Sequence, residues 1–167
     1  MKKTLGGSTV ACLALGLLVA SLVCSWSTGL QAQTDPIIGT WRLNVAKSKY
    51  DPGPAPMSET RIYETFGTNG IKSTQNRVEV GGSKATVSYS AMYDGKDYAY
   101  MGSPDADTIA LKKVDTNTIE ATLKKSGKVT LLTKAVTAAD RKTRTLTTSG
   151  TNAKGQKVNN VTVWERQ

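Results

Sequence analysis

Residues 84–102 of this chain read KATVSYSAMYDGKDYAYMG, two alternating segments on either side of Asp94-Gly95. In the first segment Val87, Tyr89 and Ala91 share one face, and mostly hydroxyl-bearing residues occupy the other. Successive side chains of a β-strand point to opposite faces of the sheet, so this period of two predicts half-buried strands. An Asp-Gly pair between them predicts a tight hairpin turn, because glycine adopts the positive φ that the turn requires. We therefore expect two antiparallel strands here.

Similar alternating segments recur through residues 33–167 at intervals of roughly 8–14 residues, separated by turn residues. Their number predicts about ten strands, and no stretch of this region shows a convincing helical period. Consecutive short strands pair antiparallel, and a sheet that closes on itself has no unpaired edges. We expect one all-β domain over residues 33–167, an antiparallel up-and-down β-barrel without substantial helix, in preference to an open sandwich.

The first 32 residues have the features of a signal peptide. Lys2 and Lys3 precede an uncharged apolar run over residues 11–23, which is too short to cross a bilayer, and a small residue, Ala32, ends the segment. We expect cleavage near Ala32 and a secreted or periplasmic protein. Cys24 follows the apolar run as a lipoprotein cysteine would, but the valine before it disfavours lipid attachment, so we prefer simple cleavage.

The composition of the mature region excludes most catalytic chemistry. Both cysteines lie in the leader and the chain has no histidine, which excludes a Ser-His-Asp triad, a cysteine nucleophile and the usual zinc, copper or haem sites. The acidic cluster of Asp94, Asp97, Asp105 and Asp107 lies beside turn signals, where it supplies few oxygens for calcium and no buried carboxylate pair. We therefore expect no enzyme activity, no metal and no cofactor.

The mature region is basic, with 20 basic and 13 acidic side chains and a net charge of +7. Such a domain favours anionic surfaces and ligands. The bases are scattered, and the dense stretches 112–113, 124–125 and 141–144 are expected mostly on solvated strand faces and turns. The chain has few aromatic residues and is expected to be exported, and both features argue against nucleic-acid binding. We expect a monomer.

Two stretches leave alternatives open. Residues 71–80 are polar on both faces, which fits an edge strand or a strand that faces a wet interior. Residues 51–56 read DPGPAP, and prolines at alternate positions exclude a central strand or a helix interior. This segment is an extended loop, either a plain connector or the rim of a barrel entrance.

Gly39-Thr40-Trp41 and the C-terminal stretch 161–166 resemble the first and last strands of the calycins, the superfamily of lipocalins and fatty-acid-binding proteins. More closely, residues 35–167 resemble uncharacterised exported bacterial lipocalin-like proteins. The resemblance implies that Trp41 closes one end of the barrel and that Arg166 covers its ring, a cation–π contact of about 0.5–2 kcal/mol.

The chain also departs from the calycin pattern. Thr162 and Trp164 stand where fatty-acid-binding proteins have the Arg-x-Tyr pair that holds a carboxylate. A helical lid after the first strand and the lipocalin disulfides are missing as well, so a fatty-acid ligand does not follow from the resemblance.

Tyrosines gather around the hairpin of residues 84–102, and Tyr89, Tyr98 and Tyr100 are candidate ligand-binding residues if they face inward. The alternative is ordinary cross-strand packing of aromatic side chains. The best functional prediction is a non-catalytic, exported, lipocalin-like barrel that binds a small amphipathic or hydrophobic molecule. The alternative is a cell-envelope or extracellular interaction module that uses its basic exterior and holds no internal ligand.

Overall fold

A computed structural model describes residues 35–167. The predicted leader (residues 1–32), its cleavage near Ala32 and the alternative lipid attachment at Cys24 lie outside the described residues.

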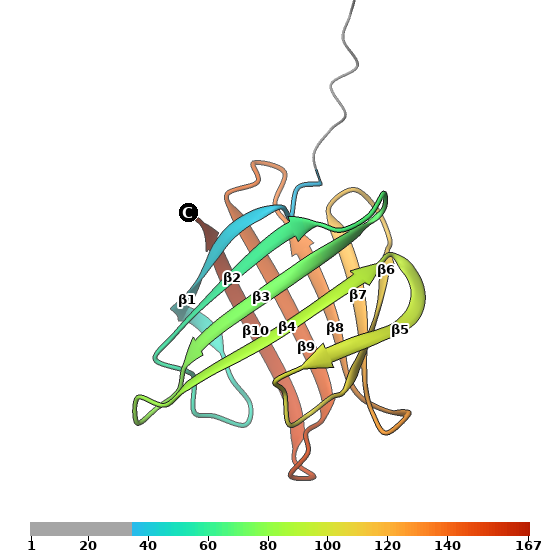
Figure 1. Cartoon of the computed structure of the whole chain (residues 1–167). Helices are drawn as coiled ribbons and strands as arrows, with labels where there is room; N and C mark the ends of the chain where they lie inside the picture. The colour runs from blue at the N-terminus through green and yellow to red at the C-terminus, as the bar shows by residue number, and fades with distance from the viewer. Residues whose placement is uncertain (1–34) are drawn as a thin grey trace, which may run out of the picture. The chain divides into compact units, whose positions relative to one another are not determined.

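The described chain forms ten antiparallel strands and no helix (Figure 1). The strands are β1 (Gly39–Lys49), β2 (Ser58–Thr65), β3 (Gly70–Val78), β4 (Lys84–Met92), β5 (Asp94–Met101), β6 (Thr108–Lys113), β7 (Thr118–Lys125), β8 (Lys128–Thr137), β9 (Thr143–Thr151) and β10 (Lys157–Arg166). Each pairs with its neighbours in sequence and β1 also pairs with β10, so the sheet closes into a barrel. The predicted up-and-down barrel of about ten strands is therefore confirmed. No helix within residues 35–167 is long and apolar enough to cross a membrane.

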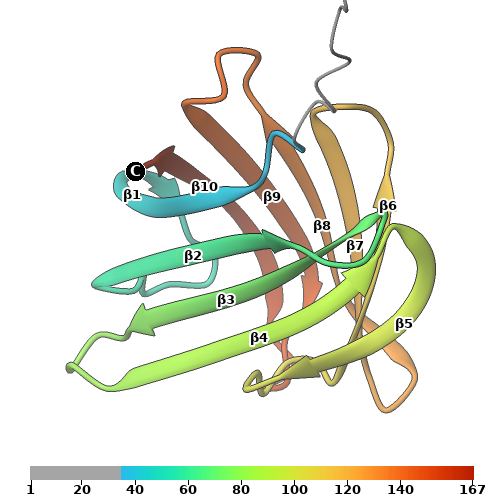
Figure 2. The same cartoon turned by 45° about the horizontal axis from the view of Figure 1, so that its top comes forward.

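The pair of consecutive strands β4 and β5, predicted from residues 84–102, forms the shortest ladder of the barrel. The chain reverses at Tyr93, between the end of β4 and the start of β5. The turn predicted at Asp94-Gly95 is therefore wrong: both residues belong to β5, and Gly95, with a φ of 75°, lies where the register of β5 against β6 shifts. β4 and β5 share only two paired positions, Ser88–Met101 and Tyr89–Tyr100, whereas the neighbouring pair of β3 and β4 is joined at nine positions. The two strands therefore diverge toward the turn, as Figure 2 shows.

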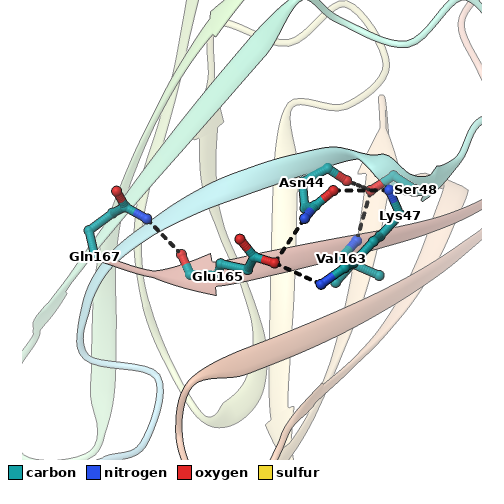
Figure 3. Close-up of polar contacts among 6 residues, drawn as sticks. All are labelled: Asn44, Lys47, Ser48, Val163, Glu165 and Gln167. Atoms are coloured by element: carbon teal, nitrogen blue, oxygen red, sulfur yellow. Dashed lines mark hydrogen bonds and ion pairs between the residues drawn. The ribbon is translucent and has the colours of Figure 1, made fainter.

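The ladder that closes the barrel contains a bulge in β1, where the register shifts between Asn44 and Lys49. Ser48 Oγ accepts a hydrogen bond from the Val163 backbone N–H at 2.9 Å and donates one to the Asn44 carbonyl at 2.7 Å (Figure 3). On the outer face Asn44 Nδ2 donates to Glu165 Oε1 at 2.8 Å. The Ser48 hydroxyl thus accepts the hydrogen bond that a backbone carbonyl would accept in a regular ladder. The Val163 N–H therefore keeps an acceptor at the bulge.

The core fills the end of the barrel at which β1 starts and β10 ends. Trp41 and Trp164, on β1 and β10, are almost wholly buried, and Ile37 before β1 is 1% exposed. Trp41 pairs with Arg166, and Leu43 pairs with Trp164, so the two indoles occupy successive inward positions along the closing ladder. We call this region the closed end. Beyond it, side chains do not fill the interior of the barrel completely.

Candidate functional site

The interior of the barrel holds a cavity of about 350 Å³. Its walls differ in chemistry: β2–β5 supply most of the charged and hydroxyl-bearing side chains, and β6–β9 supply mainly aliphatic ones. These two groups of strands lie on opposite sides of the barrel (Figure 2). The cavity is thus polar on one side and mainly apolar on the other.

The polar wall contains a continuous row of hydroxyl-bearing residues across four strands. Tyr63 on β2 pairs with Ser73 on β3, Ser73 pairs with Tyr89 on β4, and Tyr89 pairs with Tyr100 on β5. The three tyrosines line the cavity, and the ring centroids of Tyr89 and Tyr100 are 5.6 Å apart. Ser73 is fully buried, and its Oγ has no hydrogen-bond partner among the described residues.

An ion cluster lies on the same wall, nearer the loops at the other end. Glu59, which is 1% exposed, accepts hydrogen bonds from Arg61 Nε at 2.8 Å and from Arg77 Nε at 3.0 Å. Burial opposes ionisation of this carboxyl, but the two guanidinium charges outweigh it and hold the pKa of Glu59 below its ordinary value of 4.5. The carboxylate of Glu59 is therefore already neutralised by the protein.

Arg61 also covers the inner tryptophan. Its guanidinium carbon lies 4.2 Å from the ring centroid of Trp164, within the range of a cation–π contact. Trp164 Nε1 donates to Thr162 Oγ1 at 2.9 Å, so both residues of the last strand point inward and satisfy each other.

Arg144 on β9 has a different environment from the other inward arginines. It is 4% exposed, lines the cavity, and its guanidinium carbon lies 5.1 Å from the ring centroid of Tyr63. Its Nε and Nη1 atoms have no hydrogen-bond partner, and no carboxylate within residues 35–167 forms an ion pair with it. Burial raises the pKa of Tyr63, but the charges of Arg144 and Arg61 outweigh burial and lower it below its ordinary value.

The opposite wall is mainly aliphatic. Ile109 and Leu111 come from β6, Ile119 and Leu123 from β7, and Leu146 from β9, and all five are buried and line the cavity. They occupy alternate positions of their strands, as expected for an inward face. This wall offers a surface for an apolar group, and its hydrogen-bonding groups come from β8 and β9, where Thr133, Arg144 and Thr148 line the cavity.

Three loops surround the end of the cavity that is farthest from the closed end. Pro52, Pro54 and Pro56 all line the cavity, so the proline-rich segment is part of its rim rather than a plain connector. The start of this segment is tied to β10, because the Asp51 N–H donates to Asn160 Oδ1 at 2.7 Å. On the other side the 103–107 loop is tied to the turn before β10, where Ala153 N donates to Asp105 Oδ1 at 2.8 Å.

The closed end brings together the two residues that the calycin resemblance pairs. Trp41 is completely buried, and the Arg166 guanidinium carbon lies 4.4 Å from its ring centroid. Arg166 donates to the backbone carbonyls of Pro36, Ile38 and Arg141, and Trp41 Nε1 donates to the Ile37 carbonyl at 2.7 Å. Every polar group of this pair is directed at the protein backbone, which is the environment of a structural contact.

Two of the three predicted ligand-binding tyrosines face the cavity. Tyr89 is buried and Tyr100 is half-buried, and both line it. Tyr98 packs against the core outside the cavity lining, and its hydroxyl donates to Asp94 Oδ2 at 3.0 Å. Its side chain is held at the start of β5, so Tyr98 has no place in the candidate site.

Sequence reasoning missed the charged residues of the interior. Arg144 was expected with the solvated stretch 141–144, but the strand that begins at Thr143 turns this one side chain inward. Glu59, Arg61 and Tyr63 alternate along β2, a signal that could have placed three polar groups on one face. Residues 71–80 were predicted to form either an edge strand or a strand that faces a wet interior. The structure favours the second, because β3 pairs with a neighbouring strand on both sides.

No family model, no curated protein and no solved structure matches this chain. The resemblance to calycins therefore stays a prediction. Within residues 35–167 no group of three metal-ligating acidic, histidine or cysteine side chains gathers in one place.

Proposed function

We propose that this protein is a non-catalytic, exported carrier or receptor that binds a small amphipathic molecule inside its barrel. The observation that carries the proposal is the two-sided cavity, with tyrosines and charged groups on β2–β5 facing aliphatic side chains on β6–β9. Its volume of about 350 Å³ is at the lower end of the range typical of small-molecule sites. The cavity therefore suits a molecule of modest size.

The division of the walls argues for an amphipathic ligand rather than a purely apolar one. An apolar molecule would leave the buried hydroxyl of Ser73 on the polar wall and the guanidinium of Arg144 on β9 without partners, which costs free energy. A purely polar molecule would leave the aliphatic wall in contact with polar groups and forgo the gain from burying apolar surface. A ligand with one polar and one apolar part satisfies both walls.

A neutral environment-sensitive dye tests whether the interior binds ligands. We expect Nile red to bind saturably, at about one site per chain. Ala121→Phe places a ring in the cavity, because Ala121 lines it, whereas Thr122→Phe adds the same ring to the outer face of the same strand. Dye binding should fall in the first variant and persist in the second, with both folded by circular dichroism.

Equal dye binding in the two variants would place the dye on the exterior and favour the interaction module over the carrier. Native mass spectrometry of protein from its own host provides a second test, since a co-purifying small molecule is expected. Sequencing the mature N-terminus tests export, with an end near Gln33 expected and a lipid-modified Cys24 contradicting it.

A further inference from the structure

We propose that the ligand carries a carboxylate and that the guanidinium of Arg144, at the inner end of the cavity, binds it. This inference rests on the proposed function and names the chemical class of the ligand. It starts from the one cavity-lining arginine of the described chain whose charge the protein leaves without a counter-ion.

The position of Arg144 places its charge deep in the barrel. On β9 it pairs with Trp164 of β10, which in turn pairs with Leu43 of β1, one inward position from Trp41. Its guanidinium extends over the ring of Tyr63 on β2, a strand on the other side of the closing seam. The group therefore lies next to the closed end and far from the proline-lined rim.

The other two arginines of the cavity have their partners in the protein. Arg61 and Arg77 both bind Glu59, at 2.8 Å and 3.0 Å, and Arg77 also lies 3.5 Å from Glu79. Arg144, by contrast, is 4% exposed and has unsatisfied Nε and Nη1 atoms. A buried charge is unfavourable unless it is paired and hydrogen-bonded. A bound anion would supply the counter-ion and the hydrogen-bond acceptors that the protein does not give Arg144.

The surroundings of Arg144 select an anion with a single charge and an apolar body. The guanidinium of Arg144 lies over the ring of Tyr63. The buried acidic group of the polar wall, Glu59, is already paired with Arg61 and Arg77. One uncompensated guanidinium matches one negative charge, and guanidinium N–H groups form charge-assisted hydrogen bonds with carboxylates. Leu146, two residues along β9, and Ile119 line the cavity beside it and would contact the apolar part.

This site differs from the arginine–tyrosine clamp that fatty-acid-binding proteins carry in the last strand. Here Thr162 and Trp164 of the last strand, β10, point inward and are hydrogen-bonded to each other. The unpaired guanidinium belongs to Arg144 on the preceding strand, β9. The inference therefore follows from the unsatisfied donor on β9.

Displacement of Nile red by matched probes tests the inference. Decanoate and decanol have the same chain and differ in the charge of the head group. We expect wild-type protein to bind decanoate about tenfold more tightly than decanol, as a charge-assisted hydrogen bond in a buried site provides. Arg144→Gln should abolish this preference, whereas Arg42→Gln, which removes the same charge from an exposed position on β1, should retain it.

A second measurement uses the unmodified protein and does not depend on how the variant folds. The pKa is raised in five of the six tyrosines, at positions 50, 89, 93, 98 and 100, and lowered only in Tyr63. Tyr63 should therefore ionise first in an absorbance titration of tyrosinate, and Tyr63→Phe should remove that first step. Saturating decanoate should move the step to higher pH, because it neutralises the nearby guanidinium, and decanol should not.

The outcomes separate this inference from the proposed function. If Nile red binds inside the barrel but octanoate, decanoate and dodecanoate displace it no better than the alcohols, the carboxylate is wrong and the carrier stands. An unchanged first tyrosinate step with bound decanoate would likewise overturn the role of Arg144. If Ala121→Phe and Thr122→Phe bound Nile red equally well, that result would instead contradict the proposed function itself.

Discussion

Three arginines of this barrel lie over aromatic rings, and two of them, Arg166 and Arg144, have contrasting environments. Arg166 covers Trp41 at the closed end and gives its N–H groups to three backbone carbonyls. Arg144 covers Tyr63 in the cavity, and two of its nitrogen atoms have no acceptor within the described chain. The first guanidinium is satisfied by the protein, which makes it a structural contact. The second has unused hydrogen-bonding capacity, which is expected of a group that binds a ligand.

The largest effect should come from removing the ring at the closed end. Trp41 is completely buried, so Trp41→Ala leaves a large cavity and should lower the free energy of unfolding by about 3–5 kcal/mol. Trp41→Phe should be milder, because most of the ring remains. Urea denaturation midpoints measure both variants, and an Ala variant as stable as the parent would remove the case for a structural closed end.

The ion cluster on the polar wall should give the next largest effect. Glu59→Gln leaves Arg61 and Arg77 without their common carboxylate, and we expect a loss of about 3 kcal/mol. Glu64→Gln is the matched control, since Glu64 pairs with Lys72 at an exposed position of the same strand. A comparable loss in both variants would show that burial does not determine the effect.

The same cluster predicts acid sensitivity. The pKa of Glu59 is lower in the folded protein than its ordinary value of 4.5, so the unfolded chain binds this proton first as the pH falls. The stabilisation is therefore complete above about pH 4.5 and is lost as the pH drops through the folded-state pKa. Denaturation curves between neutral and acidic pH should show a smaller decline in Glu59→Gln than in the wild type.

Removing the satisfied arginine should cost stability and leave binding intact. Arg166→Ala deprives three backbone carbonyls of their donor, with an expected loss of about 1–3 kcal/mol. Nile red affinity should change less than twofold, because Arg166 lies outside the cavity lining. A variant of normal stability with weakened dye binding would reverse the assignment of the two arginines.

Removing the unsatisfied arginine should have the smallest effect on the ligand-free protein. Arg144→Gln loses a contact with Tyr63 but also relieves an unpaired buried charge, so the free energy of unfolding should change by less than about 1 kcal/mol. Decanoate should raise the unfolding temperature of the wild type and not of this variant. A large loss of stability without ligand would make Arg144 a structural residue like Arg166.

The sequence reveals which residues form strands more readily than it reveals which strand faces enclose the cavity. The alternation around Tyr89 predicted two consecutive antiparallel strands, and the structure has them, with the reversal at Tyr93 rather than at Asp94-Gly95. Tyr98 and Tyr100 are two residues apart and look equivalent in the sequence, yet only Tyr100 lines the cavity. The difference arises because β4 and β5 pair only near Tyr100 and separate toward the turn.

The amino-acid sequence alone is enough to predict a set of about ten antiparallel strands, one of which, over residues 39–45, alternates with Trp41 on a single face. These features depend on short-range alternation and turn chemistry, which each segment carries independently of the others. That Glu59, Arg61 and Arg144 lie inside depends on the closed barrel, since a strand with polar residues on both faces has no preferred side until its neighbours close around it. Barrel closure also placed Arg144 of β9 over Tyr63 of β2, a contact between residues far apart in the chain.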